Sequence, residues 1–254
     1  MNIPRTFLAA PAAGFAALLM MSAPAMAAES GSAQADLESI PLNDAPGSGS
    51  AMVEIDGSTL SFTLAAEGLL ADAPHAAHIH FGADARHECP TAEDDADGSG
   101  TLNTTDGAPA YGPIVISLTT EGDTSPDSGL AVDRFGVGDD FEYSRGDVEV
   151  SADVATAILA GQAAVVVHGV DHDDSGAYDG DVMSDLDPSL PTEATDPALC
   201  GVLQASQMSM PTGGVQTGEA AVGGTDLGLV AAGGVAVLAG GALLVTRRRT
   251  ATDS

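Results

Sequence analysis

Strict alternation of apolar and polar residues is the feature that most limits the fold of this chain. The stretch AMVEIDGSTLSFTLAAEGL, residues 51–69, contains two such runs with Asp56–Gly57 between them. Side chains of a strand point alternately to the two faces of a sheet, and Asp-Gly is a preferred two-residue hairpin turn. The stretch therefore predicts an antiparallel hairpin with one buried and one exposed face.

Further strand patterns follow along the chain. They occupy residues 76–82, 111–120, 140–150 and 163–171. One short helix is predicted at residues 151–161, with Ser151 as its N-cap and Gly161 at its end. Several short strands separated by Gly, Asp and Pro predict an all-β fold, an antiparallel β-sandwich. The connections at 83–107 and 171–198 are long, and long loops on such a frame usually carry binding sites.

Residues 1–28 are predicted to be a secretory signal peptide. Arg5 precedes an apolar run at 7–21, and Ala25 and Ala27 then fit an A-x-A cleavage site. The alternative, a first membrane helix, is disfavoured by a proline and a glycine inside the run. The signal places the domain that follows it outside the cytoplasm.

The segments beside the folded domain differ from it in composition. Residues 29–50 are rich in Ser, Gly and acidic side chains and are predicted to be a disordered leader. Residues 51–204 hold the strand patterns and form the predicted domain. Residues 205–226 are Gly-rich and are predicted to be a flexible stalk.

A second apolar run near the end of the chain predicts a transmembrane helix at residues 227–246. Three arginines open the predicted cytoplasmic tail, 247–254, so the domain faces the outside of the cell membrane. The order VQTG, apolar run, arginines also resembles the cell-wall sorting signal read by sortases. That signal would be cut at Thr217–Gly218, but its usual Leu-Pro is replaced by Gly214–Val215. Membrane anchoring and wall attachment are both left open.

The charge balance excludes some partners. The chain has 37 acidic residues and 7 basic ones, and Arg86, Arg134 and Arg145 are the only basic residues between 29 and 226. Nucleic acid is repelled by such a surface. The acidity suits an extracellular surface, bound cations or a salty medium. The predicted partners are therefore the membrane and an unidentified extracellular molecule.

Histidine is concentrated in PHAAHIHFGADARHEC, residues 74–89, which holds four of the chain's six His. His78 and His80 share one face of a predicted strand, and His168 ends another. Three imidazoles from two strands are a typical copper or zinc ligand set. The alternative is a solvated row of side chains, because spacing alone does not make the two strands neighbours.

The two cysteines, Cys89 and Cys200, predict a disulfide, because a secreted chain meets an oxidising compartment. That bond would close a loop of about 110 residues, which is worth roughly 4–5 kcal/mol in the chain-entropy model.

Several motifs together resemble two known families. AHIHFG, VVVHG and ALCGVL resemble the copper/zinc superoxide dismutase family, and GLLADAPHAAHIHFG with ILAGQAAVVVHG resembles the secreted CHRD domain. The resemblance covers about residues 51–203 and implies a Greek-key antiparallel β-sandwich. It also implies that His78, His80 and His168 hold copper-ligand positions and that Cys89 pairs with Cys200.

The departures from the dismutase pattern are specific. Residues 90–110 hold no His where the family has further zinc-site ligands, and Pro197 stands where the family has an arginine that guides superoxide. We therefore expect a cell-surface binding or structural module. The alternatives are a copper-only superoxide dismutase and an extracytoplasmic copper-binding protein, so whether the chain is an enzyme stays open.

Two acidic stretches match the twelve-residue calcium loop. DADGSGTLNTTD, residues 95–106, ends in Asp106 where a longer Glu is usual, and DHDDSGAYDGDV, residues 171–182, has Val182 there, so that Asp181 would substitute. Calcium would neutralise loops that otherwise repel themselves; the alternative is solvated Asx turns. The predicted calcium ligands are Asp95, Asp97, Ser99, Thr101, Asn103, Asp106, Asp171, Asp173, Ser175, Asp179 and Asp181.

Overall fold

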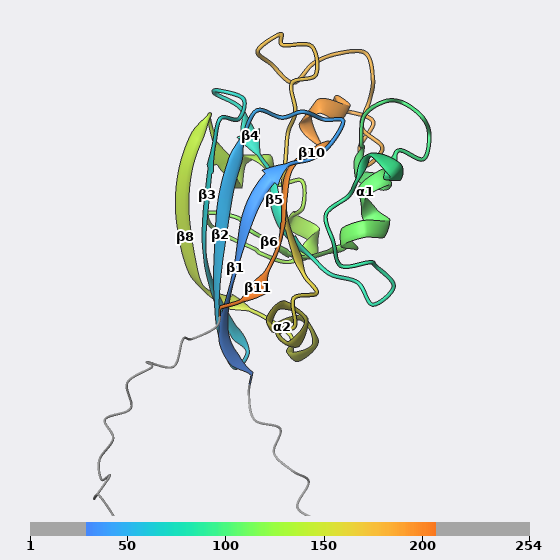
Figure 1. Cartoon of the computed structure of the whole chain (residues 1–254). Helices are drawn as coiled ribbons and strands as arrows, with labels where there is room; N and C mark the ends of the chain where they lie inside the picture. Colours follow the sequence, from blue (N-terminus) through green and yellow to red (C-terminus); the bar gives the residue numbers. More distant parts are fainter. Residues whose placement is uncertain (1–28, 207–254) are drawn as a thin grey trace, which may run out of the picture. The chain divides into compact units, whose positions relative to one another are not determined.

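The computed structural model describes residues 29–206, and one antiparallel sheet organises them (Figure 1). Its hydrogen-bonded order is β6-β5-β9-β10-β1-β2-β3-β8, and β11 pairs with β1. The strands are β1 (Ser30–Ser39), β2 (Ser48–Asp56), β3 (Thr59–Glu67), β5 (Ala77–His80), β6 (Ile114–Ser117), β8 (Asp140–Glu149), β9 (Ala164–His168), β10 (Pro197–Val202) and β11 (Gln204–Ala205). A small second sheet pairs β4 (Pro74–His75) with β7 (Gly136–Val137). The predicted all-β antiparallel fold is confirmed, and its strands form one continuous curled sheet.

The predicted hairpin is present as β2 and β3. Asp56 pairs with Thr59, so the two-residue turn is Gly57–Ser58, one position later than predicted. Gly57 has a φ of +66°, a left-handed conformation that glycine adopts without strain. Burial alternates along both strands, as the sequence pattern predicted.

The prediction of a disordered leader at 29–50 is wrong, because this segment forms β1 and the start of β2. Ala33, Ala35 and Leu37 are buried and alternate with exposed polar residues. The period of two therefore outweighs the Ser-rich, acidic composition that suggested disorder. β1 pairs with β2 along most of its length and with β10 near its end, so it joins the two halves of the sheet.

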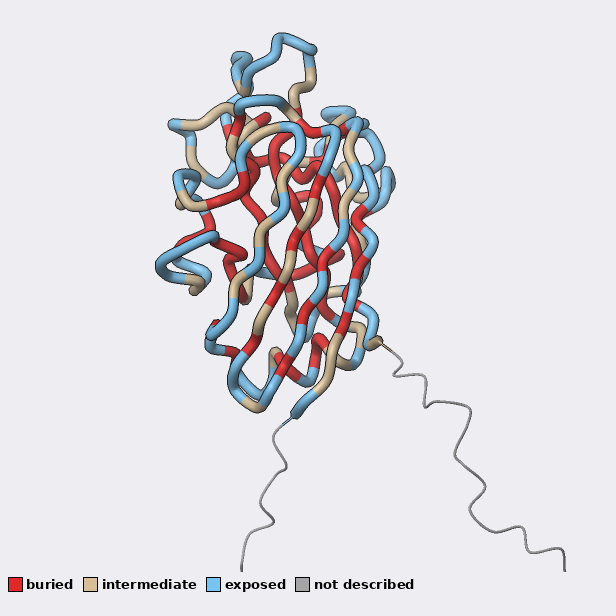
Figure 2. Tube along the Cα trace, turned by 90° about the vertical axis from the view of Figure 1, so that its left-hand side faces the viewer, coloured by how far each residue is buried: buried red, intermediate tan, exposed pale blue. Residues whose placement is uncertain are grey.

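The sheet curls so that its concave face encloses the main core. Side chains of this core come from both ends of the strand order, including Leu64 of β3 and Ile79 of β5. Figure 2 shows buried and exposed positions alternating along the strands. β9 is buried on both faces: Val165 and Val167 face the main core, and Val166 packs in a second cluster with Leu102.

The long connection between β5 and β6 covers the second cluster. This connection contains α1 (Thr104–Tyr111), a helix that strand-based reasoning did not predict, and Asn103 caps it by accepting a hydrogen bond from the Asp106 N–H. The disulfide between Cys89 and Cys200 ties the connection to β10 and confirms the predicted pairing.

The other helices are short. α2 (Ala152–Leu159) is the predicted one, and the Ser151 side chain caps it at the Val154 N–H. The single-turn helices are η1 (Ala92–Asp94), η2 (Pro126–Ser128), η3 (Val132–Arg134) and η4 (Thr192–Ala194).

Several sequence predictions concern residues outside the described part of the chain. These are the signal peptide at 1–28, nearly all of the stalk at 205–226, the transmembrane helix at 227–246 and the tail at 247–254. Within residues 29–206, no helix is both long enough and apolar enough to cross a bilayer.

The role of β1 in the core can be tested with a matched pair of substitutions. Leu37 is 1% exposed, so Leu37→Ala is expected to lower the free energy of unfolding by about 2–5 kcal/mol. Gln34→Thr, at an exposed position of the same strand, is expected to change it by no more than about 0.5 kcal/mol. Urea unfolding measures both, and equal small effects would mean that β1 is not part of the core.

Candidate metal centre

Three histidines meet on the outer face of the sheet, where β5 and β9 are hydrogen-bonded neighbours. His78 lies opposite Val166 and His80 lies opposite Ala164, and His168 ends β9 on the same face. The ring centroids of His78 and His168 are 5.1 Å apart, and His80 lies 5.7 Å from His78 and 6.1 Å from His168. The structure thus places side by side the three imidazoles that the sequence singled out.

Each imidazole is fixed by one backbone carbonyl. The three bonds are His78 Nε2 to the Gly129 oxygen (3.0 Å), His80 Nδ1 to the Gly112 oxygen (2.8 Å) and His168 Nδ1 to the Thr195 oxygen (2.7 Å). A carbonyl only accepts, so each of these nitrogens carries the proton and each ring has one defined neutral tautomer. The second nitrogen of every ring therefore presents a lone pair.

Those second nitrogens are His78 Nδ1, His80 Nε2 and His168 Nε2. All three are buried, and none has a hydrogen-bond partner in the described part of the chain. One nitrogen of each ring lies within 4.8 Å of the corresponding nitrogens of the other two. Nitrogens that share one metal at about 2.0–2.1 Å lie at most about 4 Å apart, so only a small contraction is needed. The set therefore fits a metal ion.

Burial keeps these rings uncharged. It lowers the pKa of His80 to about 3 and the pKa of His168 to about 4, because a charged ring loses its hydration. Burial, followed by the two neighbouring imidazoles, lowers the pKa of His78 well below its ordinary range. Neutral imidazole is the form that binds a metal, so the three rings are ready as ligands at neutral pH.

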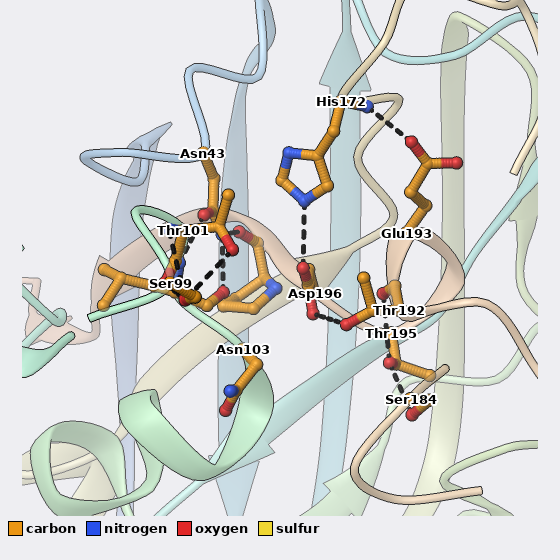
Figure 3. A network of polar contacts seen from close by, with 12 residues as sticks. Asn43, Ser99, Thr101, Asn103, His172, Ser184, Thr192, Glu193, Thr195 and Asp196 are labelled. Atoms are coloured by element: carbon orange, nitrogen blue, oxygen red, sulfur yellow. Dashed lines mark hydrogen bonds and ion pairs between the residues drawn. The ribbon is translucent and has the colours of Figure 1, made fainter. Parts of the chain in front are cut away.

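The Thr195 carbonyl that fixes His168 also accepts a hydrogen bond from the Thr104 hydroxyl at 2.9 Å, and a polar network joins the side chains around Thr195 (Figure 3). Asp196 accepts hydrogen bonds from His172 Nε2 at 2.9 Å and from the Thr192 hydroxyl at 2.7 Å, and the Thr195 hydroxyl bonds Ser184 at 2.7 Å. Partners of this kind set the orientation of ligating imidazoles. The network thus extends the centre beyond the three rings.

Glycine is required at position 112, whose carbonyl accepts the hydrogen bond from His80. Gly112 has a φ of +87°, and a Cβ there would lie 2.7 Å from the Gly82 nitrogen. Its backbone therefore approaches the residues just after β5 closely, and its oxygen reaches His80.

The three rings form the floor of a cavity of about 410 Å³. Its walls come from α1 and the residues after it, from the segment around Leu130, and from residues 186–195. No Asp, Glu, Lys or Arg lines this cavity. Pro197 is buried in β10 and provides no charge either, so the arginine of the dismutase pattern has no counterpart at the centre.

The first acidic loop brings only part of its predicted ligands together. Carboxylate oxygens of Asp95, Asp97 and Asp106 lie within 4.8 Å of one another. Asn103 instead caps α1, and the Thr101 carbonyl accepts a hydrogen bond from Ser99 at 3.0 Å. Asp95 itself accepts from the N–H groups of the loop backbone, which holds the turn closed.

The second acidic loop recruits a residue that sequence reasoning missed. Carboxylate oxygens of Asp171 and Asp173 lie within 4.8 Å of one from Glu193, which is in η4. Asp181, predicted to complete this loop, is exposed and outside the group. Ser175 and Asp179 bond each other at 3.3 Å. Glu193 lies beyond the twelve-residue pattern, so no local signal identified it.

Comparisons with known proteins give one family match. The model of the family described as "CHRD domain" matches residues 29–177. Among solved structures, Candida albicans superoxide dismutase 5 in a Cu(II) form is 14% identical, with a TM-score of 0.38, and the match covers 72% of this chain and 97% of that chain. A mutant of the same protein is 13% identical, with a TM-score of 0.36, over 77% of this chain and 99% of that one. A search of curated proteins finds no match.

Acid is expected to destabilise the metal-free chain through the buried imidazoles. When the chain unfolds, each ring returns to a pKa near 6.5, so below that pH the unfolded state binds more protons and stability falls until the folded pKa is reached. Each such ring contributes about 1.4 kcal/mol per pH unit. Urea unfolding with chelator between pH 4 and 6.5 should show a shallower pH slope for His80→Gln than for the parent. His87→Gln, a change outside the cluster, serves as the control, and an unchanged slope in His80→Gln would contradict the assignment.

Proposed function

The chain belongs to the CHRD domain family, as its motifs predicted, and on this premise we propose that it is an extracytoplasmic copper-binding protein. His78, His80 and His168 are the proposed protein ligands. Its secreted and membrane-anchored location follows from the predicted signal peptide and C-terminal apolar run, and is part of the same proposal.

The observation that carries this proposal is the set of three buried lone pairs. A buried acceptor without a partner costs about 1–3 kcal/mol, so three at one point are unfavourable unless something binds them. A hydrogen-bonded side chain would satisfy one of them, whereas a single metal ion satisfies all three. A metal site therefore explains an arrangement that packing alone leaves costly.

Copper is favoured over other metals by the ligand chemistry. Imidazole suits copper, zinc, iron and nickel, and affinity for divalent first-row metals is highest at Cu²⁺. Three neutral rings in a cavity that no carboxylate lines give no ligand suited to calcium or magnesium. Copper would supply one-electron redox chemistry when bound.

Residues of this chain would orient the ligands of the bound metal and limit its contact with water. The Gly129, Gly112 and Thr195 carbonyls hold the rings in fixed tautomers, and the cavity walls exclude bulk water on several sides. Superoxide dismutation is the weaker alternative, because no cationic residue lines the route to the rings and the acidic surface repels an anion.

Copper titration of the full chain tests the proposal. One Cu²⁺ per chain is expected to bind and to raise the melting temperature. His80→Gln or His168→Gln should weaken binding more than about 100-fold, since each removes a direct ligand. The matched control is His87→Gln, whose ring bonds Gly82 outside the centre and which should bind as the parent does.

The outcomes of the copper experiment are distinct. Equal copper affinity in the parent and in both ligand variants would refute the site. Displacement of copper by equimolar Zn²⁺ would identify a zinc protein instead. A copper-loaded chain that consumes superoxide no faster than its His168→Gln variant would remove the dismutase alternative.

Calcium binding at the two acidic loops is a second proposal. The support for it is Glu193, a carboxylate from η4 that joins Asp171 and Asp173 although it is outside their loop. Glu193 also accepts hydrogen bonds from the N–H groups of His172 and Asp179, so it holds the loop closed. Bound calcium would order the residues that border the metal centre.

A matched pair of exposed aspartates tests the calcium proposal. Asp173 belongs to the carboxylate group and Asp181 does not. Calcium at millimolar concentration should raise the melting temperature of the parent and of Asp181→Asn, and raise that of Asp173→Asn less. No rise in the parent would remove calcium from the account.

A further inference from the structure

The cavity beside the three imidazoles has mostly apolar walls, which is unusual for a site that binds only ions. Large apolar side chains dominate the walls; they are Ile114, Leu130, Val132, Leu186 and Leu190. Three of them remain substantially exposed at the surface: Leu130 (39%), Val132 (40%) and Leu186 (49%). Exposed apolar side chains gathered around one hollow indicate a ligand that covers them.

Charge excludes ionic ligands from this cavity. No Asp, Glu, Lys or Arg lines it, so neither an anion nor an organic cation finds a partner in its walls. The arginines of the described chain are bonded elsewhere: Arg86 to Asp94, Arg134 to Ser128 and Arg145 to Thr119. Placing a charge in an apolar site without a partner is costly. The ligand is therefore neutral.

Size limits the ligand further. A cavity of about 150 Å³ already binds benzene, and drug-sized ligands occupy roughly 300–1,000 Å³. At about 410 Å³, this cavity suits a molecule with one or two rings. A folded protein segment is too large for it.

The side-chain hydroxyls among the lining residues are those of Thr104, Thr105, Tyr111 and Thr195. The Tyr111 hydroxyl is already used, because it donates to the Thr104 carbonyl at 3.3 Å. The three imidazole nitrogens are buried and out of reach of a ligand. Thr104 and Thr105 are not buried, and their hydroxyls already donate to the Thr195 carbonyl and to Asp185, so toward a ligand they are acceptors. A molecule with one donating hydroxyl and an apolar body matches these oxygens and the walls together.

We propose that this cavity binds a small neutral phenol or aromatic alcohol, with the hydroxyl at Thr104 and Thr105 and the ring against Leu130 and Leu186. This inference does not rest on the proposed function, because the residues that it uses are not the proposed copper ligands.

The probe is 4-methylphenol, measured against the full chain by calorimetry and by ligand-observed NMR. Toluene has the same ring without the hydroxyl, and 4-hydroxybenzoate has the same hydroxyl with a charge in place of the methyl group. We expect 4-methylphenol to bind the metal-free chain, toluene to bind about 3–10-fold more weakly, and 4-hydroxybenzoate at least about 10-fold more weakly.

Two substitutions at exposed positions locate the site. Leu186→Asp puts a carboxylate at the mouth of the cavity and should weaken 4-methylphenol binding at least about 10-fold. Val182→Asp adds the same charge at an exposed residue that does not line the cavity, and should leave binding unchanged. Neither residue is buried, so both variants should fold.

The possible results separate the two proposals. If the chain binds 4-methylphenol but no copper, the proposed function fails and the cavity inference stands. If it binds copper but 4-methylphenol binds neither form, the cavity inference is overturned. Equal effects of the two Asp variants, or tighter binding of 4-hydroxybenzoate than of 4-methylphenol, would also overturn it.

Discussion

The pairing of β5 with β9 is the interaction on which the candidate centre depends. In this antiparallel register, Ala77 and Ile79 face the main core together with Val165 and Val167. The alternate positions necessarily face the other way, and there they bring the three imidazoles together. A shift of one residue in this pairing would turn the imidazoles into the main core, so the packing of the core also fixes the site.

A covering segment shields the imidazoles on that outer face from bulk water. The connection that contains α1 lies over it, with Leu102 and Tyr111 packed among the buried residues, and the Cys89–Cys200 disulfide ties the connection to β10. Because the face is covered, the backbone carbonyls of Gly112, Gly129 and Thr195 meet the rings without competition from water. The same cover removes solvent from the free nitrogens, and this accounts for the low pKa values.

Much of this arrangement could be predicted from the sequence, and the rest depended on long-range contacts. The period of two gave the β2–β3 hairpin and the shared face of His78 and His80, because both are local consequences of strand geometry. At β1, the Ser-rich and acidic composition led to a wrong prediction of disorder. The buried residues that alternate with polar ones there are mostly alanines, which are too small to give a strong hydrophobic signal. α1 was missed because it has only two turns and contains Pro109.

The residues of the site could be predicted from the sequence, but the groups that surround them could not. No sequence rule gives the carbonyl that each imidazole meets, since Gly129 and Thr195 are 51 and 27 residues away from their histidines. Glu193 was missed for the same reason: it reaches the second acidic loop from a separate turn. The apolar cavity is likewise assembled from three distant segments, and none of them is a recognisable motif alone.

The energetics of the described chain connect the disulfide to the centre. Three buried acceptors without partners cost roughly 1–3 kcal/mol each, before any metal is bound. A disulfide that closes a loop of this length contributes about 4–5 kcal/mol, a value of comparable size. Because the bond also holds the cover over the imidazoles, it stabilises the very segment that makes the site unfavourable in the absence of a ligand.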